Sequence, residues 1–245
     1  MKTILKLALA SLLFLVLLSC QKDKDILPAN ARLKQVLLYD SINAKDPYGI
    51  EEEYEYNESG QISKVLYSNY GDRFNKYHLY EYNSAGQLVQ IKEYYGDSPS
   101  GITYTYTYSS EGKKVKESVQ YWSRSGYNLF FYTDGRLSRI ESYGWPQSTD
   151  QLFESRIFEF DDYGQSIREV LYGFNNEPYE WTINTFSNGL MVKTEIYVDE
   201  TLQNNRRKIY RTFDANKNLK IKETYEGRAS SGVGHRICKY IYFGE

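Results

Sequence analysis

One turn-centred pattern recurs seven times along this chain. In each copy an aromatic residue precedes a polar stretch rich in Asn, Asp, Ser and Gly, and an aliphatic residue follows in most copies. The copies span residues 56–62, 82–88, 108–115, 132–137, 160–164, 186–190 and 213–219. Their leading aromatics are 24 to 28 residues apart, and a period of that size is typical of repeat architectures. The chain is therefore expected to form one repetitive structure rather than a globule around a single catalytic pocket.

Each copy predicts a β-hairpin. Before the turn, aromatics alternate at every second residue, as at Tyr80 and Tyr82, which places them on one face of a strand. The turn residues are those that tolerate positive φ or hydrogen-bond their own backbone. After several turns an aliphatic residue precedes a base and an acid, as in Ile91-Lys92-Glu93, and the base and acid should point to opposite faces. We expect positive φ at the turn glycines Gly60, Gly86 and Gly112.

The other ends of the hairpins are longer and less alike. They span residues 68–76, 96–101, 123–127, 144–151, 173–178, 199–207 and 226–235. With a first strand near 36–39 and a last near 236–242, the pattern predicts about sixteen antiparallel strands. The expected fold class is an all-β meander over residues 35–245, twisted or curled, with no helix longer than two turns. The sequence leaves open whether the sheet is open, spiral or closed.

The N-terminus predicts export and lipidation. Lys2 and Lys6 precede an uncharged, mostly apolar run at 7–18, which suits a signal peptide over 1–19 and is too short to span a bilayer. The following Leu-Ser-Cys, ending at Cys20, resembles the lipobox of bacterial lipoproteins; an ordinary secretory signal is the alternative. Acyl chains on Cys20 would anchor the protein to a membrane, with a tether over 20–34. The charged residues 21–25 resemble a Bacteroidota export signal, which implies the outer membrane with the protein facing the exterior.

The repeated Tyr-Asn/Asp-x-x-Gly-x-Leu/Ile pattern resembles the YD repeats of the RHS family. The resemblance covers most of residues 36–242 and is looser in the last two copies, where Phe186 has a shortened turn and Phe213 lacks the glycine. In that family the repeats form long β-sheets that spiral into shells, and related repeats occur in adhesive surface proteins. The resemblance thus implies a small YD-type lipoprotein of Bacteroidota.

Composition and motifs argue against catalysis, cofactors and nucleic-acid binding. The segment from Cys20 onward has 28 basic and 32 acidic side chains, with no basic stripe. The two histidines, His78 and His235, lie far apart in sequence without metal-ligand spacing. The acidic run 51–55 alternates between two strand faces, which favours a solvated face over a hydrolytic carboxylate pair. We expect no catalytic residue, metal or cofactor, and expect Cys238 to be a buried hydrophobic residue.

The candidate binding residues are aromatics that the repeat does not require. Tyrosines within the strands are explained by cross-strand packing, whereas loop aromatics escape that explanation. The candidates are Trp145, Tyr70, Phe174 and Tyr179. The leading hypothesis is a non-catalytic surface lipoprotein that binds glycan or protein through its irregular loops. A purely structural envelope protein is the alternative, and a degenerate enzyme domain is a third. A large exposed aromatic patch on the loop edge would favour the first hypothesis.

Overall fold

The computed structural model describes residues 31–67, 76–122, 124–144, 151–203, 205–228 and 232–242. Over these residues the chain forms sixteen β-strands and no helix. The strands are β1 Leu33–Tyr39, β2 Gly49–Tyr56, β3 Ile62–Tyr67, β4 Lys76–Tyr82, β5 Leu88–Tyr95, β6 Ser98–Tyr108, β7 Lys114–Tyr121, β8 Arg124–Thr133, β9 Arg136–Gly144, β10 Leu152–Phe160, β11 Ser166–Gly173, β12 Pro178–Ser187, β13 Leu190–Tyr197, β14 Asn205–Phe213, β15 Leu219–Arg228 and β16 Gly232–Tyr242.

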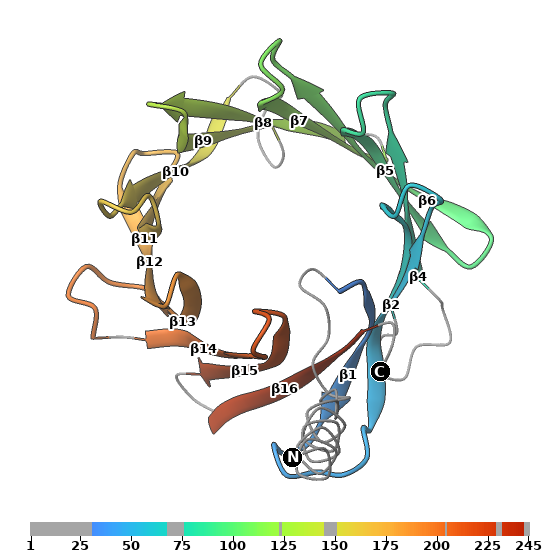
Figure 1. Cartoon of the computed structure of the whole chain (residues 1–245). Coiled ribbons are helices and arrows are strands. Elements are labelled where there is room, and N and C mark those ends of the chain that lie inside the picture. The colour runs from blue at the N-terminus through green and yellow to red at the C-terminus, as the bar shows by residue number, and fades with distance from the viewer. Residues whose placement is uncertain are drawn as a thin grey trace, which may run out of the picture.

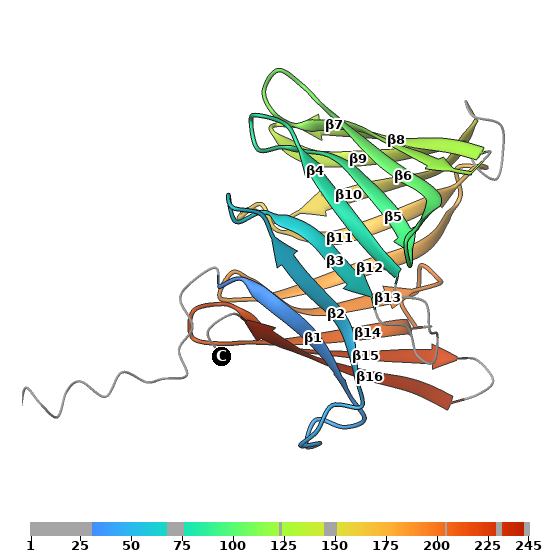
Figure 2. The ribbon, with the colours of Figure 1, turned by 90° about the vertical axis from the view of Figure 1, so that its right-hand side faces the viewer.

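The strands form a single closed antiparallel barrel. Each strand pairs with its neighbours in sequence, and β1 pairs with β16 to close the ring. Figure 1 looks along the ring, and Figure 2 shows the strands running obliquely around it. The prediction of an all-β antiparallel meander is confirmed. The closed barrel is a more specific arrangement than the curled repeat sheet expected from the sequence.

Hairpin turns of the predicted kind join the two strands of each repeat at one end of the barrel, here called the tight-turn edge. Gly60, Gly86 and Gly112 have φ angles of 79°, 76° and 79°, as expected. In the second turn the Asn83 side-chain oxygen accepts hydrogen bonds from the amides of Ala85 and Gln87, at 3.0 and 2.9 Å. The conserved geometry of these turns follows from turn chemistry that the sequence repeats.

In the first four copies the aromatic that precedes the turn is a tyrosine, and its hydroxyl has a second role. Its hydroxyl donates a hydrogen bond to a backbone carbonyl about twenty residues earlier, in the preceding hairpin. Tyr82 donates to Ile62 O at 2.8 Å and Tyr108 to Leu88 O at 2.7 Å, and similar bonds link other copies. These bonds account for the tyrosines of the first four copies, because only tyrosine carries the donor; the last three copies have phenylalanine there.

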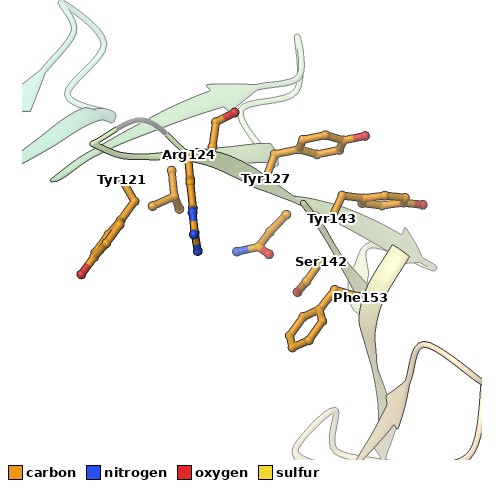
Figure 3. Close-up of a pocket in the computed structure, with 10 residues that line it drawn as sticks. Tyr121, Arg124, Tyr127, Ser142, Tyr143 and Phe153 are labelled. Carbon is orange, nitrogen blue, oxygen red and sulfur yellow. The ribbon is translucent and has the colours of Figure 1, made fainter. Parts of the chain in front are cut away.

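The two faces of the barrel wall can be told apart in Figure 3. Arg124, Ser142 and Phe153 point to the concave side of the curved sheet, whereas Tyr127 and Tyr143 point away from it. Side chains alternate along a strand, and residues paired across strands share a face. The register of every strand pair therefore extends this assignment around the barrel, and it places the repeat aromatics on the inner wall.

The inner wall holds a small apolar cluster where the barrel closes. Val36 and Leu38 of β1 pack with Cys238 of β16, and all three side chains are buried. Cys238 is thus a buried residue, as expected from its apolar surroundings. The burial of this cluster stabilises the closing β1–β16 pair.

The outer wall is charged. Ion pairs join neighbouring strands on this face, with Lys64 to Glu55 at 3.5 Å and Lys92 to Glu81 at 2.7 Å. Further pairs between strands are Arg168–Glu159 and Lys208–Glu195, and Lys193–Glu195 is a pair within β13. Charged side chains therefore recur around the outer wall.

The other end of the barrel, here called the irregular-loop edge, carries the connections β1–β2, β3–β4 and so on to β15–β16. Three of its connections are shorter than the sequence indicated. The strand β6 begins at Ser98, β8 at Arg124 and β16 at Gly232, so only residues 96–97, 122–123 and 229–231 lie between strands there. The prediction of longer loops at 96–101, 123–127 and 226–235 is therefore wrong, because strand pairing extends through most of these segments.

Candidate functional site

Exposed aromatic side chains gather at the irregular-loop edge. Among the residues that the structure describes, those of this edge are Tyr48, Tyr95, Tyr121, Trp122, Phe153, Phe174 and Tyr179. The tight-turn edge presents Tyr163, which is 89% exposed. The aromatics of the irregular-loop edge lie on or beside separate connections, which together form an aromatic rim, and Tyr121 and Trp122 are in ring contact. Exposed aromatic surface of this kind is a candidate for interaction with a ligand.

Trp122 is the most exposed tryptophan that the structure describes. It lies between β7 and β8, its side chain is 69% exposed, and its backbone adopts a left-handed conformation with φ of 50°. The indole nitrogen donates to the carbonyl of Ser100 on the neighbouring hairpin. The ring lies over Gly101, where a Cβ atom would collide with it. The ring is thus held in place while most of its surface faces solvent, an arrangement suited to stacking against a ligand.

A cavity of about 320 Å³ is lined by Tyr121, the residue that precedes this tryptophan. Its walls come from β7 to β10 and include Val119, Tyr121, Arg124 and Phe153. Figure 3 shows Tyr121, Arg124, Ser142 and Phe153 on the concave side of the sheet. The cavity is mostly apolar with a guanidinium at its rim, a combination that can hold a sugar ring or an aromatic side chain.

The candidates named from the sequence are only partly described. Phe174 and Tyr179 do lie at the irregular-loop edge and are 67% and 44% exposed. The Tyr179 hydroxyl donates to a carboxylate oxygen of Glu154 on β10, which holds this ring against the inner rim. Trp145, Tyr70 and the lipidation residue Cys20 lie outside the described residues.

Tyr121, Trp122 and Phe153 were missed as site residues. The signal in the sequence is the adjacent pair Tyr121-Trp122, whose tryptophan has no counterpart in the other copies of the repeat. Their rings lie close together, with centroids 5.6 Å apart. The predicted loop at 123–127 began one residue too late to include this tryptophan.

A buried polar cluster lies on the inner wall of β4 and β5. Glu93 is 2% exposed, and its carboxylate accepts from Lys76 Nζ at 2.5 Å and pairs with His78 Nε2 at 3.0 Å. Burial favours the neutral acid, but the hydrogen bonds from Lys76 and His78 prevail and lower the pKa of Glu93 below its usual 4.5. The cluster therefore holds an ionised carboxylate that balances the charge of Lys76 inside the wall.

The described part of the chain shows neither a cluster of metal-binding side chains nor a membrane-spanning helix. No group of three or more His, Cys, Asp or Glu side chains there could hold a metal ion. None of the described residues belongs to a helix long and apolar enough to cross a membrane.

Comparison with known proteins gives only distant structural likenesses. The sequence matches no family model and no curated protein. A porin-like protein from Bacteroides uniformis has a TM-score of 0.43 and 12% identity, over 73% of this chain and 96% of that protein. A porin-like protein from Bacteroides vulgatus has a TM-score of 0.38 and 10% identity, over 87% and 99%. The Photorhabdus luminescens Tc holotoxin pore has a TM-score of 0.32 and 10% identity, over 80% and 13%. At such low scores and identities these likenesses carry no inference about family or function.

Proposed function

We propose that this protein is a non-catalytic, YD-repeat lipoprotein of the outer membrane that faces the cell exterior. The lipid on Cys20 links it to the membrane, and the barrel itself stands in water. The aromatic rim of the irregular-loop edge binds a glycan or a surface protein. The observation that carries this proposal is the gathering of exposed aromatics at one edge of the barrel.

The outer wall supports the placement of the barrel outside the bilayer. A wall that faces lipid presents an apolar band and keeps its polar residues inside. Here ion pairs such as Lys92–Glu81 and Arg168–Glu159 lie on the outer wall, where a lipid-facing wall would be apolar, and most of the repeat aromatics lie inside. Charged groups in hydrocarbon are costly, so lipid contact around this wall is unfavourable.

Two variants test the aromatic rim. Trp122→Ala removes an exposed aromatic from the irregular-loop edge, and Phe153→Ala removes one from the wall of the cavity. An aromatic anchor that a ligand buries contributes about 2 kcal/mol or more to binding. On a glycan array, and in pull-downs from outer-membrane extracts, we expect each variant to bind at least about tenfold more weakly. Trp145→Ala, the strongest candidate from the sequence, belongs in the same series.

Tyr163→Ala is the matched control. It removes an even more exposed aromatic, but from the tight-turn edge, and should leave binding unchanged. Thermal unfolding of each variant serves as the folding control, so that a loss of binding is compared only between folded proteins. Binding that ignores Trp122 and Phe153 but falls with Tyr163→Ala would refute the placement. Failure of the wild type to bind in either assay would favour the alternative, a purely structural envelope protein.

A further inference from the structure

Basic side chains cluster on the inner wall of β14 to β16, across the ring from the cavity that β7 to β10 line (Figure 1). The ladder of paired residues that starts at inward-pointing Ser142 leads through β10 to β13 and on to this wall. It assigns four bases to the inner face: Arg207, Arg211, Lys222 and Arg236. Three of them, Arg207, Lys222 and Arg236, line a cavity of about 360 Å³, together with Ile209, Thr224, Glu226 and His235.

Two of these bases face each other directly. Arg211 and Lys222 are register partners across β14 and β15, and like charges in that position destabilise a sheet. Arg211 donates a hydrogen bond to Thr194 Oγ1 at 2.9 Å. Burial lowers its pKa, which shows that the protein interior disfavours its charge. Lys222 makes no ion pair with any residue that the structure describes.

The acids on this wall do not balance the bases. Glu226 pairs with Arg207 at 2.7 Å, and Glu51 of β2 pairs with Arg236 at 2.5 Å. Both carboxylates are thus engaged by the other two bases, so Arg211 and Lys222 have no carboxylate of their own among the described residues. In addition, Nε of Arg207 is buried and has no hydrogen-bond partner. An unsatisfied buried donor carries a free-energy cost that a bound acceptor would remove.

Lys222 faces inward because the last copy of the repeat exchanges the faces of its base and its acid. In earlier copies the base faces outward and the acid inward, as Lys92 pairs with Glu81 outside and Glu93 with Lys76 inside. In Ile221-Lys222-Glu223 the faces are exchanged. Lys222 is paired with inward-facing Arg211, and Glu223 lies outside near His235. The exchange arises because the triplet begins eight residues after Phe213 but nine after Tyr82, and one residue changes the face.

We propose that the inner wall of β14 to β16 binds an oxyanion ligand, a molecule carrying carboxylate, sulfate or phosphate groups. Arginine presents donors in a planar fork that fits such groups, and lysine adds a mobile point charge. An oxyanion between Arg211 and Lys222 would relieve their repulsion. This site is independent of the aromatic rim, because no residue of one belongs to the other.

The test is calorimetric titration at low ionic strength. The probes are citrate, inorganic phosphate and trigalacturonate, with neutral galactotriose as the uncharged counterpart of the last. We expect binding of at least one anion and none of galactotriose, with affinity falling as salt is added. Preference for trigalacturonate over the free ions would indicate an acidic sugar as the natural source. A hydrogen bond to a charged group contributes enough that Lys222→Gln should weaken binding about tenfold.

Lys92→Gln is the matched control, since it removes a lysine from the outer wall and should leave the affinity unchanged. Melting temperature provides a second readout. Without anions, Lys222→Gln should melt at or above the wild-type temperature, because it removes a repulsion; with anions, the wild type should gain more than the variant. The proposal is overturned if none of the three anions binds, or if Lys92→Gln weakens binding as much as Lys222→Gln.

Discussion

Lys92 and Glu93 are neighbours in sequence, yet their side chains lie on opposite sides of the barrel wall. Lys92 pairs with Glu81 in solvent, whereas Glu93 is buried against Lys76 and His78. A Lys–Glu pair therefore contributes differently to the free energy of unfolding on the two sides of the wall. Exposed pairs contribute little, whereas removing one partner of a buried pair leaves an uncompensated charge.

The buried pair makes stability depend on pH. The folded-state pKa of Glu93 lies below its unfolded value of 4.5, so its stabilising effect is fully present above that value and is lost as the pH falls through the folded pKa. We expect Glu93→Gln to lower the free energy of unfolding by about 3 kcal/mol at neutral pH. Below pH 4.5 the difference from wild type should shrink. Denaturant unfolding across this range measures it.

Glu81→Gln is the control for that measurement, since it alters the exposed pair on the outer wall. It should change stability little at any pH. A Glu93→Gln variant with wild-type stability at neutral pH would show that the buried cluster does not support the fold.

At the scale of the hairpin, the tight turn is the unit that the sequence specifies best. The glycine of each well-formed copy adopts a backbone conformation that other residues resist, and the preceding tyrosine ties the hairpin to its neighbour. Local chemistry alone therefore sets turn geometry and strand register for much of the barrel.

Gly86→Val tests the turn. The φ of Gly86 is 76°, which a β-branched residue adopts only with strain, while the space around it is nearly open. We expect a loss of more than about 1 kcal/mol in the free energy of unfolding. Gly86→Asn should cost less, because Asn tolerates this conformation. Gly49→Ala, at a glycine with open space and no positive φ, should be silent, and equal stability of all three variants would contradict the turn assignment.

The hairpins could be predicted from the sequence because each is specified by turn residues within a few positions of one another. The face of an individual side chain and contacts between hairpins could not, because they depend on residues outside the repeated pattern. The face of Lys222 was not foreseen, because the triplet looks the same whether it begins eight or nine residues after the aromatic. Trp122 was not predicted as a site residue, because its position depends on contact with Ser100 and Gly101 of another hairpin. A one-residue shift or a cross-hairpin contact changes a site without changing the pattern.

At the scale of the whole molecule, the closure of the sheet into a barrel is the feature that the sequence did not predict. It joins strands from the two ends of the domain, with Leu38 opposite Cys238 and Val36 opposite Tyr240. The repeats within one sheet do not determine how many strands complete a ring, because every copy can pair with a further one. The apolar cluster at the β1–β16 seam supplies the contacts that end the array.

In the proposed arrangement the membrane link runs through Cys20 and the barrel wall faces water. Replacement of Cys20 by alanine tests both points directly. We predict that the Cys20→Ala protein leaves the membrane fraction and is folded, β-rich and monodisperse in detergent-free buffer, by circular dichroism and light scattering. A protein that stays in the membrane, or that requires detergent to fold, would show that the wall contacts lipid and would contradict this arrangement.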